Sequence, residues 1–322
     1  MKSNSYYMAV DIGGTKTAAA LFTPRGEILD DIVLTVKSRT FSGEETVYQD
    51  TKNLLQDLLA GFELRPENLA GIGVGSPGPL DSKKGVIIHA PLMGWRNFPL
   101  SDRLRKDFGL PVALDNDGNL GALAEQRRGV AKGFQNVIYM TVSTGCGSGI
   151  VLNGEIYHGR NDGAGEIGHT VLFPEGLPCP CGSSGCFEQY ASGTALNRTA
   201  RRDLSAGTES LVLSLTGGDL ERIDGKILLE AAEKGDPYAR SLYEKEGFYL
   251  GISAANWFNL LDPDVLVLGG GVTKAKAFFY ESMMRTFRER CIQPVNDDQI
   301  RFSEMNDRIV LYGAFYLIST RI

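Results

Sequence analysis

The sequence lacks an apolar run of the roughly 20 residues needed to cross a bilayer. It also lacks an excess of basic residues, because 33 Lys and Arg stand against 39 Asp and Glu, a formal net charge of −6. This balance argues against a nucleic-acid-binding surface. The first residues contain no apolar segment followed by a small-residue cleavage site, so we expect no signal peptide. We therefore expect a cytoplasmic protein with no membrane or nucleic-acid partner.

Cysteine and histidine are scarce, with five and three in 322 residues. An odd number of cysteines, three of them in one short segment, does not suit a disulfide framework. The segment is residues 166–188, and it contains His169, Cys179, Cys181 and Cys186. Three thiolates spaced C-x-C-x4-C and one imidazole complete the ligand set of a structural Zn²⁺ site. The alternative is three reduced thiols and a packed histidine in a Gly- and Pro-rich loop.

Glu166 and Glu188 stand at the two ends of this segment. A metal-bound loop would hold both carboxylates rigidly, which suits ligand binding. Together with Asn116 they are candidates for binding sugar hydroxyls, because buried acceptors that each take one hydroxyl proton discriminate stereochemistry. The residues alone leave open which polyol they would bind.

The chain is too long for one compact core of ordinary size, so we predict two domains. Residues 6–22 and 137–152 share one pattern, a strand, a turn rich in Gly and Thr, and a second strand. This repetition predicts two β-rich α/β domains that face one another, with a boundary near Asp117. Further strands are predicted at residues 27–36, 69–75, 86–89, 111–114 and 265–268. Helices are predicted at residues 43–60, 101–108, 120–128, 194–203, 227–234, 237–261 and 310–318. Residues 204–224 remain undecided.

Three glycine turns follow predicted strands: Gly13 and Gly14, Gly145 to Gly149, and Gly269 to Gly271. Glycine lets backbone N–H groups approach a phosphate closely, because it has no Cβ. The first turn adds Asp11, which can order Mg²⁺ and water, and Thr15 and Lys16, which can reach phosphate oxygens. A Walker loop is excluded here, because Thr15 precedes Lys16 and a strand follows the turn in place of a helix. Three such turns favour a nucleoside triphosphate, although any one of them could be purely structural.

Asp117 follows the strand predicted at residues 111–114 and lies at the proposed domain junction. A carboxylate there can accept a hydroxyl proton as the oxygen attacks phosphorus. Spacing alone favours a simpler interpretation, in which Asp115, Asn116 and Asp117 form an Asx turn and cap the next helix. Cys146 is interpreted as small and apolar, and His89, His158 and Cys291 as packing or surface residues.

Several motifs together resemble the ROK family of repressors, open reading frames and sugar kinases. They follow the family's order over nearly the whole chain: DIGGTK at 11–16, GSPGPLD at 75–81, GW at 94–95, DNDGN at 115–119, STGCGSGI at 143–150, GEIGH at 165–169, CPCGSSGCFEQYASG at 179–193 and VLGGG at 267–271. The cysteine stretch is the most specific of them.

The resemblance implies an α/β actin-like ATPase fold of the hexokinase type, which is ribonuclease H-like, with two lobes and a catalytic cleft. The predicted smaller lobe comprises residues 1–116 and 308–322, and the larger lobe, with the zinc loop, residues 117–307. The resemblance implies Asp117 as general base. It places around ATP the residues Asp11, Gly13, Gly14, Thr15, Lys16, Thr144, Gly145, Gly147, Gly269, Gly270 and Gly271. It implies a sugar site formed by Gly78, Asn116, Glu166, His169 and Glu188, with His169 shared between the sugar and Zn²⁺.

One position departs from the family pattern. Many family glucokinases have Asn-Leu-Gly-Trp where this chain has Leu92-Met93-Gly94-Trp95, so an expected sugar-contacting amide is absent. An N-acetylmannosamine or N-acetylglucosamine kinase, or a fructokinase, is therefore the alternative to a glucokinase. Only about five residues precede the DIGGTK strand, so we do not expect the DNA-binding domain of the family repressors. A non-catalytic sugar sensor is a further alternative, although Asp11, Lys16 and Asp117 are all present.

The sequence therefore predicts an ATP-dependent kinase that phosphorylates a hexose, with glucose on O6 as the first choice. Asp117 would take the hydroxyl proton, while Mg²⁺ and the glycine-turn N–H groups would stabilise charge on the transferring phosphoryl group. Closure of the lobes would exclude water. The resemblance also predicts a homodimer.

Overall fold

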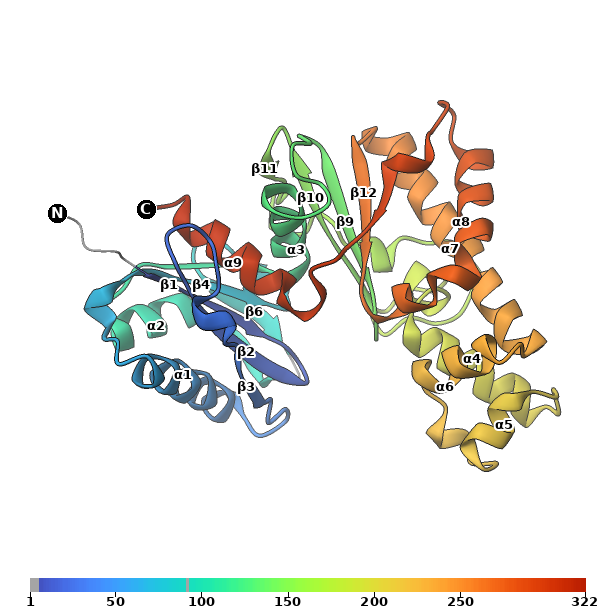
Figure 1. Ribbon diagram of the computed structural model, residues 1–322, viewed down its shortest axis with the longest axis horizontal. Coiled ribbons are helices and arrows are strands. Elements are labelled where there is room, and N and C mark those ends of the chain that lie inside the picture. Colours follow the sequence, from blue (N-terminus) through green and yellow to red (C-terminus); the bar gives the residue numbers. More distant parts are fainter. Residues whose placement is uncertain (1–5, 91–92) are drawn as a thin grey trace. The chain divides into compact units, whose positions relative to one another are not determined.

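The computed structural model describes residues 6–90 and 93–322, so the departure at Leu92 lies outside the described residues. Its contacts divide the chain into two compact units (Figure 1). Unit 1 comprises Met1–Gly133, Gly149–Gly165 and Met305–Ile322, and unit 2 comprises Phe134–Ser148 and Glu166–Glu304. The predicted lobe boundary at Asp117 differs from this division, because the helix that begins there packs within unit 1 against the C-terminal helix.

The first sheet has the strand order β3-β2-β1-β4-β8. Its strands are β1 (Tyr6–Ile12), β2 (Lys16–Phe22), β3 (Leu34–Lys37), β4 (Leu69–Ser76) and β8 (Val112–Asn116). The first three form antiparallel pairs, whereas β4 pairs in parallel with both β1 and β8. The carboxyl ends of β1, β4 and β8 therefore meet at one edge, where Asp11, Ser76 and Asn116 lie.

Helices cover both faces of this sheet, because successive strand residues point to opposite sides. On β1, Met8 and Val10 pack with α1 (Glu44–Gly61) and α2 (Leu100–Phe108), and the intervening Ala9 packs with α3 (Asp117–Arg127) and α9 (Ile309–Ser319). Glycine permits the closest approach, since a Cβ at Gly73 of β4 would lie 1.9 Å from the carbonyl oxygen of Ala314 in α9. The C-terminal helix is thus fixed against the N-terminal sheet.

The second sheet has the order β11-β10-β9-β12-β13, the same arrangement as the first. Its strands are β9 (Val137–Val142), β10 (Cys146–Leu152), β11 (Glu155–Ile156), β12 (Val265–Gly269) and β13 (Ile300–Phe302). A hairpin at Asn153 and Gly154 joins β10 to β11, and β12 pairs in parallel with both β9 and β13. The repetition predicted from the two strand-turn-strand segments is therefore confirmed. A third sheet orders β5 (Leu80–Asp81), β6 (Val86–Ala90) and β7 (Trp95–Phe98).

Five helices lie in unit 2: α4 (Gly193–Ser205), α5 (Leu211–Thr216), α6 (Gly225–Glu233), α7 (Pro237–Leu261) and α8 (Lys276–Arg290). Helix α7 begins as predicted, with Pro237 at the first helical position and the Asp236 carboxylate accepting the Ala239 N–H at 2.7 Å. Helix α8 was missed, although Phe279, Met283 and Phe287 recur at helical spacing and are buried.

Three local predictions differ from the structure. The strand predicted at 27–36 is wrong over most of its length, because a 3₁₀ turn at Leu29–Asp31 interrupts it and Asp30 and Asp31 have positive φ. The helix predicted at 43–60 begins one residue later, because Gly43 is its N-cap and makes no side-chain cap bond. The undecided residues 204–224 contain the short helix α5, capped by the Ser210 hydroxyl.

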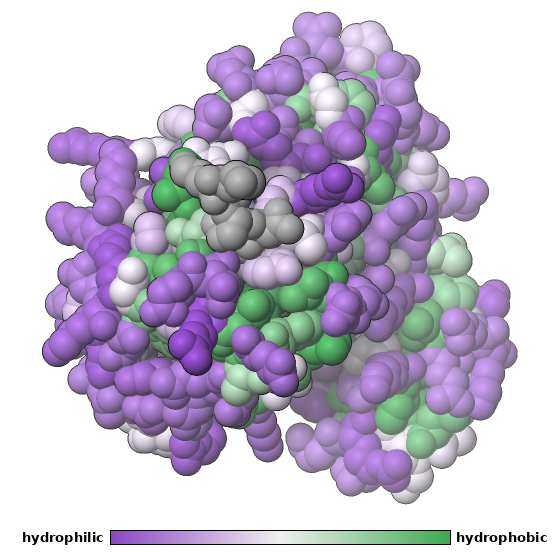
Figure 2. Space-filling view, turned by 60° about the vertical axis from the view of Figure 1, so that its left-hand side comes forward, coloured by the Kyte–Doolittle hydropathy of each residue, from purple (hydrophilic) through white to green (hydrophobic). Residues whose placement is uncertain are grey.

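No helix in the described part of the chain combines the length and apolarity that a transmembrane span requires. Figure 2 shows hydrophilic side chains over most of the visible face, with hydrophobic ones gathered in limited areas.

Candidate active site

The junction of β8 and α3 presents the predicted general base. Asn116 caps α3, since its Oδ1 accepts the Gly118 N–H at 2.9 Å, and Asp117 is the first helical residue. Asp117 Oδ1 accepts the same N–H at 2.8 Å. The capping interpretation is therefore correct for Asn116. It is compatible with a reactive Asp117, because a carboxylate at a helix N-terminus is stabilised in its ionised form.

Gly78 and Asn116, both predicted to bind sugar, lie close together. A Cβ at Gly78, which precedes Pro79 in a cis peptide, would be 3.5 Å from Asn116 Nδ2. Position 78 is therefore in van der Waals range of the amide that we expect to bind a hydroxyl group.

The first glycine turn closes the β1–β2 hairpin. The Gly13 N–H donates to the Lys16 carbonyl at 3.0 Å, and the Ser38 hydroxyl donates to the Gly13 carbonyl at 2.6 Å. Thr15 and Lys16 are exposed at its tip. Lys16 Nζ forms an ion pair at 2.7 Å with Asp307, a partner that the sequence analysis missed because 291 residues separate the two.

Asp11 lies beneath this turn in an environment that favours its protonated form. Burial raises its pKa to about 7, the negative charge of Asp117 adds to the shift, and Lys16 opposes it. Two neighbouring carboxylates supply the oxygen ligands that a divalent cation prefers, and a bound cation would stabilise their negative charges. The residues of unit 1 thus fit the Mg²⁺ that the family resemblance implies.

The second glycine turn, in unit 2, is tied to Glu188. The Cys146 N–H donates to Glu188 Oε2 at 2.8 Å, and a Cβ at Gly145 would lie 2.4 Å from that oxygen. Gly145 is therefore required for this contact, which brings a predicted sugar residue against a predicted phosphate turn. The Cys146 thiol donates to the Ala191 carbonyl, and burial raises its pKa well above the ordinary value, in agreement with a non-nucleophilic role.

A cavity of about 320 Å³ in unit 2 brings together residues just before the second glycine turn and the last residue of the third. Its lining includes the predicted Thr144 and Gly271. It also includes residues that the sequence analysis did not single out, among them Asn197, Asp224, Lys226 and Lys274. Gly269 and Gly270 have packing roles, because a Cβ there would lie 2.5 Å from the Tyr139 hydroxyl and 2.3 Å from the Val142 carbonyl oxygen, respectively. Gly147 is less constrained, with the Thr141 methyl at 3.4 Å.

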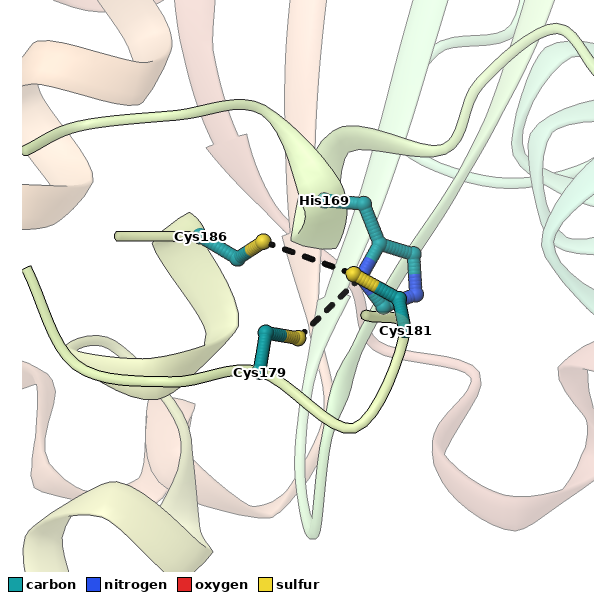
Figure 3. A group of neighbouring side chains, drawn as sticks. All are labelled: His169, Cys179, Cys181 and Cys186. Atoms are coloured by element: carbon teal, nitrogen blue, oxygen red, sulfur yellow. Dashed lines mark hydrogen bonds between the residues drawn. The ribbon is translucent and has the colours of Figure 1, made fainter. Parts of the chain in front are cut away.

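The predicted metal ligands converge in unit 2 (Figure 3). One ligand atom from each of His169, Cys179, Cys181 and Cys186 lies within 4.8 Å of all the others. The Cys181 and Cys186 sulfurs are 3.7 Å apart, and the Cys179 sulfur is 3.7 Å from His169 Nδ1. A tetrahedral Zn²⁺ with Zn–S bonds of about 2.3 Å would place two sulfurs about 3.8 Å apart. The group therefore fits a four-coordinate zinc ion, and His169 keeps Nε2 for another partner.

Two 3₁₀ turns hold the glutamates beside this group. Glu166 precedes the turn Ile167–His169, and Glu188 lies within the turn Phe187–Gln189. The two turns are in contact, and the Phe187 N–H donates to the Thr170 carbonyl at 2.8 Å. Gln189 Nε2 donates to the Cys179 sulfur at 3.7 Å, which ties the second turn to a predicted ligand.

His158, predicted to be a packing or surface residue, has a specific buried partner that the prediction did not include. Its Nε2 lies 2.7 Å from Asp115 Oδ2, and Asp115 is fully buried. The two are 43 residues apart, and no local pattern in the sequence indicates the pair.

The repeated five-strand order, with glycine turns after the first strand of each sheet, defines an actin-like ATPase fold. The ROK family pattern matches residues 7–321, and the chain belongs to the ROK family.

Particular relatives cover nearly the whole chain. It is 36% identical over 318 residues to a glucokinase of Halalkalibacterium halodurans, covering 98% of this chain and 96% of that protein. It superimposes with a TM-score of 0.82 on a ROK family glucokinase of Streptomyces griseus solved in complex with glucose and AMPPNP, at 33% identity over 96% of this chain and 98% of the other. A ROK family transcriptional regulator, homologous to the E. coli MLC protein, matches with a TM-score of 0.87 at 27% identity, and the match covers 98% of this chain and 78% of the regulator.

Proposed function

We propose that this chain is an ATP-dependent glucose kinase that transfers the γ-phosphate to a glucose hydroxyl, O6 by preference. The β8–α3 junction carries the proposal, because it presents Asp117 at a helix N-terminus beside Asn116 and near Asp11. The similarity to glucokinases, one of them bound to glucose and a non-hydrolysable ATP analogue, supports the choice of both substrates.

Each part of the site would contribute to one step of the transfer. Asp117 accepts the hydroxyl proton, and the freed oxygen attacks the γ-phosphorus in line. Asn116, Gly78, Glu166, His169 and Glu188 orient the sugar, so that little motion separates the bound state from the reacting geometry. N–H groups of the glycine turns stabilise the phosphoryl charge. Mg²⁺ supplies further neutralisation when bound, and Asp11 is the carboxylate that would hold it.

The zinc ion would be structural. Four protein ligands leave it no open position for substrate, so its role would be to fix the turns that carry Glu166, His169 and Glu188. Cys179, Cys181, Cys186 and His169 Nδ1 are the proposed ligands, and His169 Nε2 would face the sugar.

We further propose a homodimer in the cytoplasm, without membrane or nucleic-acid partners.

A coupled ADP-release assay tests the proposed function. Wild-type protein and Asp117→Asn are compared on glucose, mannose, fructose, N-acetylglucosamine and N-acetylmannosamine. We expect the highest kcat/KM for glucose. Asp117→Asn should still bind glucose, while its kcat falls about 10²- to 10⁴-fold because the proton has no acceptor.

Each possible result of the assay has a distinct meaning. Preference for an N-acetylated sugar would replace glucose with the alternative substrate class. Sugar binding without turnover of any sugar would favour a non-catalytic sugar sensor, and the similarity to a ROK family transcriptional regulator makes a regulatory role the second candidate. Near-wild-type turnover by Asp117→Asn would remove the general-base role and leave the kinase assignment in place.

A further inference from the structure

A hydrogen-bonded pair of one buried and one partly exposed side chain adjoins the β8–α3 junction. Asp115, the residue before Asn116, is 0% exposed, and its Oδ2 is 2.7 Å from His158 Nε2. A carboxylate can only accept, so Nε2 carries the hydrogen and donates it. Both residues belong to unit 1, and His158 lies in the segment that leads from β11 towards Glu166.

The other carboxylate oxygen of Asp115 bonds to residues on both sides of Asp117 in the sequence. Oδ1 accepts the Asn116 N–H at 2.8 Å and the Asn119 side-chain amide at 2.9 Å. These bonds fix the backbone just before Asp117 and a side chain half a helical turn after it. The rotamer of Asp115 thus determines how the junction presents Asn116 and Asp117.

The carboxylate of Asp115 needs a compensating group, because an isolated buried charge carries a large desolvation cost. His158 supplies the N–H donor and, when protonated, the opposite charge. The charged groups that face His158 are Asp115 and Asp162, which raise its pKa, and Arg321, which lowers it. Asp162 is itself anchored, since it accepts the Ser82 hydroxyl at 2.6 Å. The hydrogen bond to Asp115 is the largest effect and outweighs partial burial, which lowers the pKa of His158, so the net pKa is raised and the imidazolium persists to a higher pH than in water.

We propose that His158 is a positioning residue for phosphoryl transfer: by holding the buried Asp115 carboxylate in one orientation, it fixes the β8–α3 junction that presents Asn116 and Asp117. The role rests on the proposed kinase function. This role differs from those of the predicted sugar ligands and of the general base, because His158 acts through Asp115.

Steady-state kinetics of three variants test the proposal. His158→Ala should lower kcat about tenfold to a hundredfold, the cost of a small misplacement of the base, with KM for ATP unchanged. His158→Gln keeps an N–H donor without the charge and should recover much of kcat at pH 7. The matched control is Tyr157→Ala, which removes the neighbouring side chain, 48% exposed, and should leave kcat unchanged.

The pH profile separates positioning from simple packing. A group with a raised pKa contributes fully below its ordinary pKa, and its contribution is lost as pH rises through the raised value. Wild-type kcat should therefore fall on the alkaline side, and His158→Gln should lack that fall. A His158→Ala enzyme with wild-type kcat at every pH would overturn the proposal, even if its Tm were lower.

Deuterium uptake of the full-length chain gives a readout that does not depend on turnover. His158→Gln and His158→Ala should both increase uptake in peptides covering residues 112–122, the alanine variant more, with uptake elsewhere unchanged. Unchanged uptake in this segment would overturn the proposal. If the wild-type protein phosphorylates no sugar, the kinase assignment fails, whereas the uptake experiment still determines whether His158 fixes the junction.

Discussion

Asp115 and Asp117 are two carboxylates of one short motif, and their environments differ. Asp115 is the second-last residue of the edge strand β8, fully buried, and bonded to Asn116, Asn119 and His158. Asp117 is the first residue of the helix that follows. The contrast supports the proposal that Asp115 holds the junction and Asp117 accepts the proton, so that residues of the same type would have separate functions.

Glu246 on α7 is a buried acid of another kind. Within the described residues neither carboxylate oxygen has a hydrogen-bond partner, and burial raises its pKa to about 8. It lines a cavity of about 100 Å³ together with Gln189 and Tyr190, beside the turn that contains Glu188. The native protein therefore keeps a proton here that the unfolded chain releases above its ordinary pKa.

We predict that Glu246→Gln stabilises the protein at alkaline pH. Between the ordinary pKa of 4.5 and about 8 the native state binds more protons than the unfolded state, so wild-type stability falls as pH rises. The amide removes this loss, with a gain of up to a few kcal/mol at pH 9 and little change at pH 5. Thermal unfolding at the two pH values measures the difference.

Glu244→Gln, on the same helix but 65% exposed, is the control and should change Tm little at either pH. An equal Tm change for Glu246→Gln at pH 5 and pH 9 would show that its carboxyl does not titrate in this range.

At the scale of elements, the loop between Glu166 and Glu188 has no regular helix or strand to hold it. It contains the two short 3₁₀ turns and isolated bridges between Val171 and Cys186 and between Pro178 and Ser184. Backbone bonds of this number contribute modestly, since each intramolecular hydrogen bond adds only about 1 kcal/mol net. The four converging side chains, which could hold a metal ion, are therefore the main candidate for what makes this loop rigid.

We predict that removing the metal from the purified protein weakens glucose binding far more than ATP binding. The reason is that the proposed metal ligands position Glu166 and Glu188. The cavity lined by Thr144 and Gly271, two residues expected around ATP, is lined by none of the metal ligands. Titration calorimetry with glucose and with AMPPNP, before and after treatment with a chelator, compares the two affinities.

Metal content measured on the same samples is the necessary control, and restored glucose binding after Zn²⁺ addition completes it. Equal losses for both ligands would indicate general unfolding, and a protein without metal in either state would remove zinc from the site.

At the scale of the whole molecule, the same five-strand order occurs twice. In unit 1 the C-terminal helix α9 covers one face of the first sheet, where it packs on β4 and α3. A Cβ at Gly313 would lie 2.1 Å from the carbonyl oxygen of Leu120. The contact is between backbones, so a larger residue cannot be accommodated by a side-chain rotation.

We predict that Gly313→Ala lowers the free energy of unfolding by about 1–3 kcal/mol, because α9 must move away from α3. Chemical denaturation measures the change. Gly61→Ala is the matched control, because Gly61 is also helical and a Cβ there meets no atom within 4 Å.

The control should be neutral or stabilising by about 0.5–1 kcal/mol, the intrinsic preference of a helix for Ala. Gly313→Ala with the stability of the control would mean that α9 and α3 do not approach as closely as described.

The sequence alone could predict features that depend on local spacing. Strand-turn-strand segments indicated the repeated sheet, helical spacing indicated the range 237–261 that α7 occupies, and the C-x-C-x4-C spacing with His169 indicated a metal group. Local predictions were wrong where a positive φ broke a pattern, as at Asp30 and Asp31, and α8 was missed although its buried residues follow a helical period.

The tertiary structure alone decided which distant residues meet. Asp115 pairs with His158, Lys16 with Asp307, and the Cys146 N–H with Glu188, at separations of 43, 291 and 42 residues. These contacts arise from the packing of elements against one another, and no local periodicity encodes that packing. The residues expected to perform the chemistry could therefore be identified from the sequence, whereas the residues that hold them in place appeared only when the chain was folded.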